Sequence, residues 1–204
     1  MVKEFLHDQC ARKSEQVSPI RVYKHPGSLT RDGLAKWMGE WGFKKGAEIG
    51  VRAGKFSEVL CKAMPGLELK CVDPWTTGDY RARMIGAEKQ EAYYQECVKR
   101  MSQYPNVEII RRTSMDAVMG IPDESLDFVY IDGCHEFDYV MTDLIMWAKK
   151  VRQDGIISLH DYYRFKRAGV VEAINVYTHM HKVHEWFLTD EPTPTAFWAK
   201  DYKW

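Results

Sequence analysis

Short apolar runs alternate with longer amphipathic segments along the chain from Gly46 onward. Strands that alternate with helices in this way form a parallel sheet covered by helices on both faces. The pattern therefore predicts an α/β fold with a doubly wound, mostly parallel sheet. The runs with the length and β-branched content of buried strands are residues 47–51, 67–73, 107–112, 126–132 and 155–161.

Amphipathic helices are expected between and after these strands. In one of them, Val140, Leu144, Trp147 and Val151 recur at helical spacing, which is typical of a helix that packs on a sheet. The expected helices cover residues 55–64, 81–104, a short segment near Met115, 139–151 and 167–180.

The C-terminal end of the chain has a different pattern. Residues 183–189 and 195–201 both have strand composition, and Pro192 and Pro194 lie between them. Proline suits a connection better than the centre of a strand. This end therefore predicts an antiparallel hairpin.

The first 45 residues differ in kind from the rest. A polar start leads to an expected helix over residues 29–41, for which Ser28 or Thr30 is the candidate N-cap. We expect an N-terminal helical extension or lid over residues 1–45 and one domain over residues 46–204.

Composition supports one main domain and gives no overall charge signal for a nucleic acid or membrane partner, although local basic patches remain possible. At 204 residues and 45% hydrophobic content, the chain can bury one sizeable core. Its 29 basic and 29 acidic residues cancel, so no overall field attracts nucleic acid or an anionic membrane. No apolar run approaches the roughly 20 residues of a membrane span, and no signal-peptide core is present. Five cysteines without a C-x-x-C pair suggest neither a disulfide framework nor a structural zinc site, so we expect a cytoplasmic protein.

The segment "GAEIGVRAGKFSEVL" places glycines between an expected strand and an expected helix. Gly50 and Gly54 allow unusual backbone dihedral angles and close approach of a ligand, while the N-terminus of the helix favours negative charge. Glu48 lies on the strand, and Ser57 lies in the first turn of the helix. These features predict a nucleotide-type site, although a tight turn without a ligand also uses glycine.

An acid at the end of the next expected strand favours the ligand-binding interpretation. Asp73 follows Gly50 by about 23 residues, where a carboxylate can accept hydrogen bonds from both hydroxyls of a ribose. Arg52 stands where the G-x-G-x-x-G loop of dinucleotide enzymes has its second glycine, which disfavours NAD. Trp75 follows closely and is expected to pack near an adenosine.

Several motifs together resemble a known family. "EIGVRAGKFS", "CVDPW", "RRTS" and "YIDGCH…DLIMWAKKVRQDGIISLHDY" are similar to class I S-adenosylmethionine (SAM) methyltransferases, in the branch of macrocin O-methyltransferase and other small sugar O-methyltransferases. The resemblance runs from about Lys45 to the C-terminus. It implies a Rossmann-like sheet, SAM as cofactor and transfer of a methyl group to oxygen.

The resemblance also implies roles for individual residues. Asp73 would hold the ribose of SAM, and Asp132 would face the centre of methyl transfer. Ser114 would lie near the adenine, although a helix cap in "RTSMDAV" explains this serine equally well. The residues implied at the methionine end of SAM are Glu48, Gly50 and Gly54, with Ser57 beside them.

Two strand ends carry acids and imidazoles that bear on the chemistry. Asp132 ends one expected strand, and His160 and Asp161 end the next. If these strands are adjacent, two carboxylates converge, and a divalent cation would relieve their repulsion. Asp132, Asp161 and His160 are therefore candidate ligands for Mg²⁺, or for manganese or another metal, because related enzymes have an acid where His160 stands. Alternatively, the carboxylates only bind SAM and substrate.

His135 is the candidate general base, with Asp132 as the second catalytic residue. A hydroxyl must lose its proton as it accepts a methyl group, and imidazole suits that task near neutral pH. The alternatives are that His135 only fixes the turn after "DG", or that His160 is the base.

The function expected from these features is O-methylation of a sugar or another polyhydroxylated small molecule. One alternative is a protein like cephalosporin hydroxylase on the same scaffold, and another is a non-catalytic SAM- or nucleotide-binding module. The acceptor pocket is expected to involve the N-terminal segment and loop residues 76–87. The sequence does not define the acceptor, the methylated atom or the oligomeric state.

Overall fold

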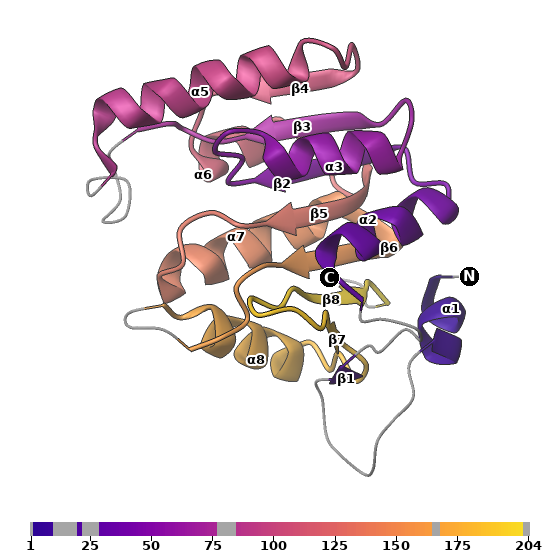
Figure 1. Ribbon diagram of the computed structural model, residues 1–204. Helices are drawn as coiled ribbons and strands as arrows, with labels where there is room; N and C mark the ends of the chain where they lie inside the picture. The colour runs from indigo at the N-terminus through magenta and orange to yellow at the C-terminus, as the bar shows by residue number, and fades with distance from the viewer. Residues whose placement is uncertain (1, 10–19, 22–28, 77–84, 165–167, 202–204) are drawn as a thin grey trace.

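A computed structural model describes the chain apart from residues 1, 10–19, 22–28, 77–84, 165–167 and 202–204 (Figure 1). The candidate cap Ser28 and the expected starts of two helices, at residues 81–84 and 167, lie outside the described residues. The described elements are α1 (Val2–Gln9), β1 (Ile20–Arg21), α2 (Arg31–Glu40), β2 (Lys45–Ile49), α3 (Lys55–Ala63), β3 (Glu68–Val72), α5 (Ala87–Met101), β4 (Val107–Ile110), α6 (Ser114–Val118), β5 (Leu126–Ile131), α7 (Phe137–Lys150), β6 (Val151–Leu159), α8 (Val170–Met180), β7 (Phe187–Leu188) and β8 (Ala196–Ala199).

The described strands form one sheet in the order β1-β7-β8-β6-β5-β2-β3-β4. Neighbours from β6 to β4 are parallel, whereas β8 is antiparallel to both β6 and β7. The predicted α/β fold and the predicted C-terminal hairpin are therefore confirmed. Strand order reverses between β2 and β5, and this switch point is where ligands bind in open α/β sheets.

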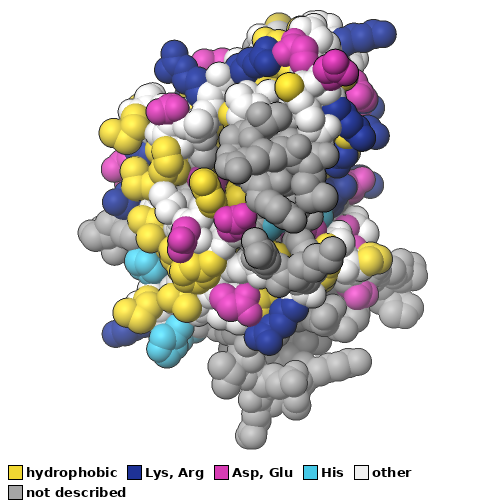
Figure 2. All heavy atoms as spheres, turned by 90° about the vertical axis from the view of Figure 1, so that its left-hand side faces the viewer, with side chains coloured by type: hydrophobic (Ala, Val, Ile, Leu, Met, Phe, Trp, Pro, Cys, Tyr) yellow, Lys and Arg dark blue, Asp and Glu magenta, His cyan; other side chains and the backbone are white. Residues whose placement is uncertain are grey.

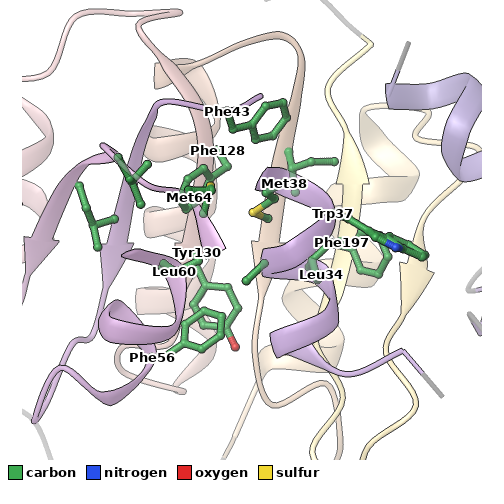
Figure 3. Close-up of a cluster of buried hydrophobic side chains, with 14 of the residues drawn as sticks. Leu34, Trp37, Met38, Phe43, Phe56, Leu60, Met64, Phe128, Tyr130 and Phe197 are labelled. Atoms are coloured by element: carbon green, nitrogen blue, oxygen red, sulfur yellow. The ribbon is translucent and has the colours of Figure 1, made fainter. Parts of the chain in front are cut away.

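Helices cover both faces of the sheet (Figure 1). The alternation of side chains along β5 shows the two layers: Phe128 and Tyr130 lie in one buried cluster, and Val129 and Ile131 lie in the other. The first cluster also contains side chains of α2, α3 and α5, and the second contains side chains of α6, α7 and α8. Side chains of α2 and α3 point toward β5 in the close-up of the first cluster (Figure 3).

The N-terminal segment shares this first cluster. Leu34 and Trp37 of α2 are buried there, and Val2 and Leu6 of α1 join them. Thr30 is confirmed as the N-cap of α2, because its hydroxyl accepts a hydrogen bond from the backbone N–H of Gly33 at 3.3 Å. The described part of residues 1–45 is thus packed on the sheet, while its separate domain status stays a prediction.

Some boundaries differ from the sequence expectations for local reasons. The strand expected over residues 155–161 begins at Val151, directly after α7, and its register with β5 shifts between Leu126 and Phe128. Residues 152–154 are polar, so the apolar run begins only at Gly155, and Asp154 has a φ of 58° at this irregular start of the strand. Helix α1 and strand β1 were not predicted, because the surrounding sequence is polar.

The structure bears on the expectations about disulfides and membrane spans. None of the described cysteines, Cys61, Cys71, Cys97 and Cys134, forms a disulfide. Over the described ranges, every helix is too short or too polar to cross a membrane.

Candidate active site

The ends of β2, β5 and β6 lie side by side at one edge of the sheet. The backbone N–H of Asp132 donates to the carbonyl of Ile49 at 2.7 Å, and the N–H of His160 donates to the carbonyl of Ile131 at 3.0 Å. The strands that carry Asp132 and His160 are therefore adjacent, as the metal hypothesis requires. The view onto this edge shows acidic side chains near its middle (Figure 2).

The glycine loop after β2 packs directly against the segment after β5. Gly50 has a φ of 90°, and a Cβ atom there would lie 2.2 Å from the backbone oxygen of Asp132. Gly54 has a φ of 71° and begins α3, and a Cβ atom there would lie 3.2 Å from Sγ of Cys97. Positive φ favours glycine at both predicted positions, and at Gly50 the backbone of Asp132 also leaves no space for a Cβ atom.

Glu48 and Ser57 form a buried pair behind this loop. Their residues are 2% and 0% exposed, and the Ser57 hydroxyl donates a hydrogen bond to Oε2 of Glu48. Burial raises the pKa of Glu48 to about 8, although the bond from Ser57 opposes that change. The carboxyl group is therefore mostly neutral at pH 7 and becomes charged only when a cation approaches or the pH rises.

Replacing Glu48 with glutamine is expected to change how stability depends on pH. The carboxyl is protonated in both states below its ordinary pKa of 4.5, but between 4.5 and about 8 only the unfolded state loses the proton. The free energy of unfolding of the wild type therefore falls as pH rises through that window. Glutamine cannot ionise, so the Glu48→Gln variant does not show this fall. Relative to the wild type, its free energy of unfolding is expected to be higher at pH 9 than at pH 5 by on the order of a few kcal/mol. Urea denaturation at both values measures this difference.

Glu68→Gln is the matched control, because Glu68 is exposed at the start of β3. The change in the free energy of unfolding caused by Glu68→Gln is expected to be the same at pH 5 and pH 9. An equally pH-independent effect of Glu48→Gln would contradict the buried neutral carboxyl.

Asp73 connects the glycine loop to the loop after β3. Its Oδ2 accepts from the backbone N–H of Arg52 at 2.9 Å, and its Oδ1 accepts from the N–H of Trp75 at 2.8 Å. The indole N–H of Trp75 donates back to the carbonyl of Arg52 at 2.7 Å. Each carboxylate oxygen has two lone pairs, so Asp73 keeps acceptor capacity for a ligand.

Trp75 itself is buried at 3% exposure and packs edge-on against Tyr94 of α5, with ring centroids 5.0 Å apart. Its positive φ of 46° departs from the usual backbone conformation for a bulky residue. The ring is held by the indole bond and by Tyr94, so it forms a fixed wall beside Asp73.

Ser114 lies at the start of α6, but it is not the cap. Thr113 takes that role, since its hydroxyl accepts from the N–H of Asp116 at 3.2 Å. The alternative interpretation of Ser114 as the cap is wrong. Oγ of Ser114 accepts from the indole N–H of Trp147 at 2.7 Å.

Asp143 is a buried acid that sequence reasoning missed. Burial raises its pKa to about 6, and a hydrogen bond with Ser114 opposes that shift. Its Oδ2 would lie 3.7 Å from a Cβ placed on Gly133 in the "DG" turn. The sequence pattern could have identified Asp143 as buried, because it lies three residues after Val140 and four before Trp147, on the apolar face of α7.

Asp132, His135 and Asp161 converge into one cluster. Nε2 of His135 lies 3.5 Å from Oδ1 of Asp132 and 3.3 Å from Oδ2 of Asp161. Among the residues described, these three can offer ligand atoms that all lie within 4.8 Å of one another. Burial favours the neutral form of Asp132, but the neighbouring imidazoles of His135 and His160 outweigh it and hold its pKa below the ordinary value. The cluster can therefore bind a cation or a proton between its carboxylates.

His160 borders the cluster on its other side. Its Nδ1 lies 3.0 Å from Oδ1 of Asp161 and 3.6 Å from Oδ1 of Asp132. Burial lowers the pKa of His160, but the two carboxylates outweigh it and raise the pKa to about 9. On the opposite edge of the ring, Nε2 lies 3.4 Å from Nη1 of Arg31 and 3.3 Å from Oγ1 of Thr193. The contacts with Arg31 and Thr193 were not predicted, because both residues lie far from His160 in sequence.

Comparison with protein families identifies the class of this chain. Residues 47–162, more than half of the chain, match the family described as "Methyltransferase domain". The chain therefore belongs to this methyltransferase family, which confirms the resemblance to class I methyltransferases. Arg31 and Thr193 lie outside the matched segment.

Solved structures share the fold at low sequence identity. An O-methyltransferase from Bacillus cereus in complex with SAH has a TM-score of 0.60 and 12% identity, over 98% of this chain and 97% of that one. The O-methyltransferase TomG from Streptomyces achromogenes, involved in tomaymycin synthesis and in complex with SAM, has a TM-score of 0.58 and 13% identity, over 86% and 83%. These similarities show the class I methyltransferase fold.

A curated relative matches part of the chain more closely in sequence. The uncharacterized protein y4gI of Sinorhizobium fredii (strain NBRC 101917 / NGR234) is 29% identical over 119 residues, which are 56% of this chain. The chain spans 12% of the length of that relative.

Proposed function

We propose that this protein is a SAM-dependent O-methyltransferase and that its acceptor is a sugar or another polyhydroxylated small molecule. The observation that carries the proposal is the contact between the Gly50 loop and Asp132 at the switch point of the sheet. It brings a nucleotide-type loop beside the acid and imidazole cluster. The structural relatives named as O-methyltransferases, with SAM or SAH bound, support the same function.

The residues divide between the cofactor and the acceptor. Asp73 binds the ribose hydroxyls, Trp75 and Ser114 border the adenosine, and the Glu48–Gly54 segment with Ser57 binds the methionine end. When bound, SAM would supply an activated methyl group to the acceptor oxygen, with S-adenosylhomocysteine as the leaving group. His135 takes the proton of the acceptor hydroxyl at Nε2, and Asp132 orients that hydroxyl. The products are the methyl ether and S-adenosylhomocysteine.

A divalent cation fits the same cluster. Asp132 and Asp161 offer oxygen donors, which Mg²⁺ prefers, and the neighbouring imidazoles of His135 and His160 also suit manganese. When bound, the cation would neutralise the carboxylates and lower the pKa of the acceptor hydroxyl. His160 was the nitrogen ligand expected from sequence, whereas the compact group in the structure contains His135.

Asp73→Ala is expected to weaken SAM binding by about 1.5 to 3 kcal/mol, the usual value of hydrogen bonds to a charged group. Isothermal titration calorimetry with SAM measures the change. Asp73→Asn keeps one oxygen for the N–H of Trp75 and is expected to fall between wild type and alanine. Unchanged SAM affinity in Asp73→Ala would remove this residue from the cofactor site.

Removal of divalent metal is expected to lower turnover by more than about tenfold, and added Mg²⁺ or Mn²⁺ is expected to restore it. The assay measures S-adenosylhomocysteine after treatment with chelator and desalting. SAM affinity, measured in the same sample, serves as the control. Full turnover in a sample shown to be metal-free would leave Asp132 and Asp161 as direct contacts to the acceptor.

The proposed function is tested by incubating the protein with SAM and a panel of glycosides and other polyols. Formation of S-adenosylhomocysteine together with a methyl ether, identified by mass spectrometry, supports it. SAM binding without methyl transfer to any hydroxyl compound would instead favour a binding module or the hydroxylase-like alternative. The Asp132→Asn variant provides the inactive control.

A further inference from the structure

Asp143 is a buried acid that has no part in the proposed methyl transfer. The residue is 7% exposed and lies on the buried face of α7. Its neighbours on that face are the apolar side chains of Val140, Leu144 and Trp147. Within the described part of the chain no cation pairs with Asp143, and the hydroxyl of Ser114 is the group that favours its charged form. An acid in such a setting calls for a further donor.

The hydrogen bonding of Ser114 fixes the role of the carboxyl group. The indole N–H of Trp147, a fully buried side chain, donates to Oγ of Ser114 at 2.7 Å. Because this bond uses the hydroxyl as an acceptor, Ser114 can give its own proton to Asp143. A carboxylate has about four acceptor positions, and one hydroxyl occupies only one of them. Asp143 therefore keeps acceptor capacity for a ligand.

The carboxyl group of Asp143 lies beside the glycine loop of the candidate site. A Cβ atom on Gly133 would lie 3.7 Å from Oδ2 of Asp143 and 3.9 Å from Cγ2 of Ile49. Cα of Gly133 would in turn lie 2.7 Å from a Cβ atom on Gly50. Asp143 is thus next to the ends of β2 and β5, at the switch point where ligands bind in open α/β sheets.

The chemistry of SAM indicates which donor would reach this acid. SAM has three kinds of donor group, which are the ammonium, the two ribose hydroxyls and the 6-amino group of adenine. The proposed site assigns the ammonium to the Glu48–Gly54 segment and the hydroxyls to Asp73. The 6-amino group remains, and Ser114, beside Asp143, is expected to border the adenosine. The ring nitrogens of adenine only accept hydrogen bonds, so a carboxylate suits the amino edge of the base and repels the others.

We propose, on the basis of the SAM site described above, that Asp143 accepts a hydrogen bond from the 6-amino group of the adenine and makes the site selective for an adenine nucleoside. Trp147 and Ser114 hold the carboxylate for this contact. Guanine and hypoxanthine have an oxygen acceptor in place of the amino group, which would face the carboxylate unfavourably. A site built around an N–H of its ligand also rejects an analogue that lacks this group.

Calorimetry at neutral pH tests the proposal with two ligands. One is S-adenosylhomocysteine, and the other is its analogue with hydrogen in place of the 6-amino group. We expect the wild type to bind S-adenosylhomocysteine about 10- to 100-fold more tightly than the analogue, the usual effect of a hydrogen bond to a charged group. Asp143→Ala is expected to bind the two ligands with nearly equal affinity. Asp143→Asn, whose amide oxygen is a weaker acceptor, is expected to discriminate to an intermediate degree.

Two matched variants distinguish this contact from a general effect on the site. Asp73→Asn is expected to weaken both ligands equally, because both have the ribose. Asp138→Asn removes an exposed carboxylate from the first turn of α7 and is expected to keep the wild-type ratio of affinities. Thermal denaturation without ligand checks that each variant is folded.

The possible failures have different meanings. Equal affinity of the wild type for both ligands overturns the role of Asp143 and leaves the proposed methyl transfer intact. An equal loss of both affinities in Asp143→Ala, with an unchanged ratio, also overturns it, because Asp143 would then only support the shape of the site. A wild type that binds neither ligand contradicts the proposed SAM-dependent function, and this inference with it.

Discussion

Replacing His135 with alanine is expected to lower kcat by about 10²- to 10⁴-fold, the usual contribution of a positioned general base. Its Nε2 lies between the carboxylates of Asp132 and Asp161, where a hydroxyl bound by those acids would meet it. SAM affinity is expected to change little, because His135 acts on the acceptor. Steady-state kinetics of S-adenosylhomocysteine formation, combined with calorimetry for SAM, separates the two effects.

His160→Ala is the matched comparison, since both imidazoles lie within 3.6 Å of Asp132. A near-normal kcat in His135→Ala together with a severe loss in His160→Ala would make His160 the base. The affinity for Mn²⁺ adds a second distinction. If His135→Ala loses that affinity as well as turnover, His135 is a metal ligand, and the role of base passes to another group.

Gly50→Ala is expected to destabilise the protein by about 2 to 6 kcal/mol. Strain at positive φ contributes about 1 to 3 kcal/mol, and overpacking contributes a similar amount. The added Cβ would lie 2.2 Å from the backbone oxygen of Asp132 and 2.7 Å from Cα of Gly133. Because these are backbone atoms, β2 and β5 must separate at the active site. Urea denaturation measures the loss of stability, and SAM affinity is expected to fall with it.

Gly66→Ala is the control for Gly50→Ala, because it introduces backbone strain at positive φ without a steric clash. Gly66 has a φ of 81°, and a Cβ atom there would meet nothing within 4 Å. Its expected cost is only about 1 to 2 kcal/mol, the value for a left-handed conformation. Equal effects of the two substitutions would show that the loop after β2 is not packed against Asp132 as described.

The sheet was predictable from sequence because each central strand is a continuous apolar run. Such runs are typical of strands in a parallel sheet, and the five parallel strands β2 to β6 were all expected, including the edge strand β4. The hairpin followed from Pro192 and Pro194, which interrupt two apolar runs. Helix α1 was not predictable, since its burial depends on Val2 and Leu6 packing on a core formed by distant residues.

The candidate active site was predictable where acidic residues and histidines follow the ends of strands. Asp73, Asp132 and Asp161 follow apolar runs, and parallel strands bring their carboxyl ends to one edge. Arg31 and Asp143 lacked such a signal. The first is one of many surface-type cations at a helix start, and the second lies on a helix, so only tertiary packing brings them to the site.

The adenosine side illustrates the same limit. Asp73 was expected to hold a ribose, and the structure shows its carboxylate also fixing the loops of Arg52 and Trp75 through backbone N–H groups. The sequence pattern indicated an acid at this position, but it did not indicate that the acid also holds the two loops together. Loss of Asp73 is therefore expected to change the shape of the site as well as the proposed contact with the ribose.

The most direct test of the central claim is a crystal structure of the protein with SAM bound. The account predicts that the methionine end lies along Gly50 and Gly54, that the ribose hydroxyls bond to Asp73, and that the methyl group points toward Asp132 and His135. SAM bound away from the Gly50 loop, or bound there with its methyl group directed away from His135, would contradict it.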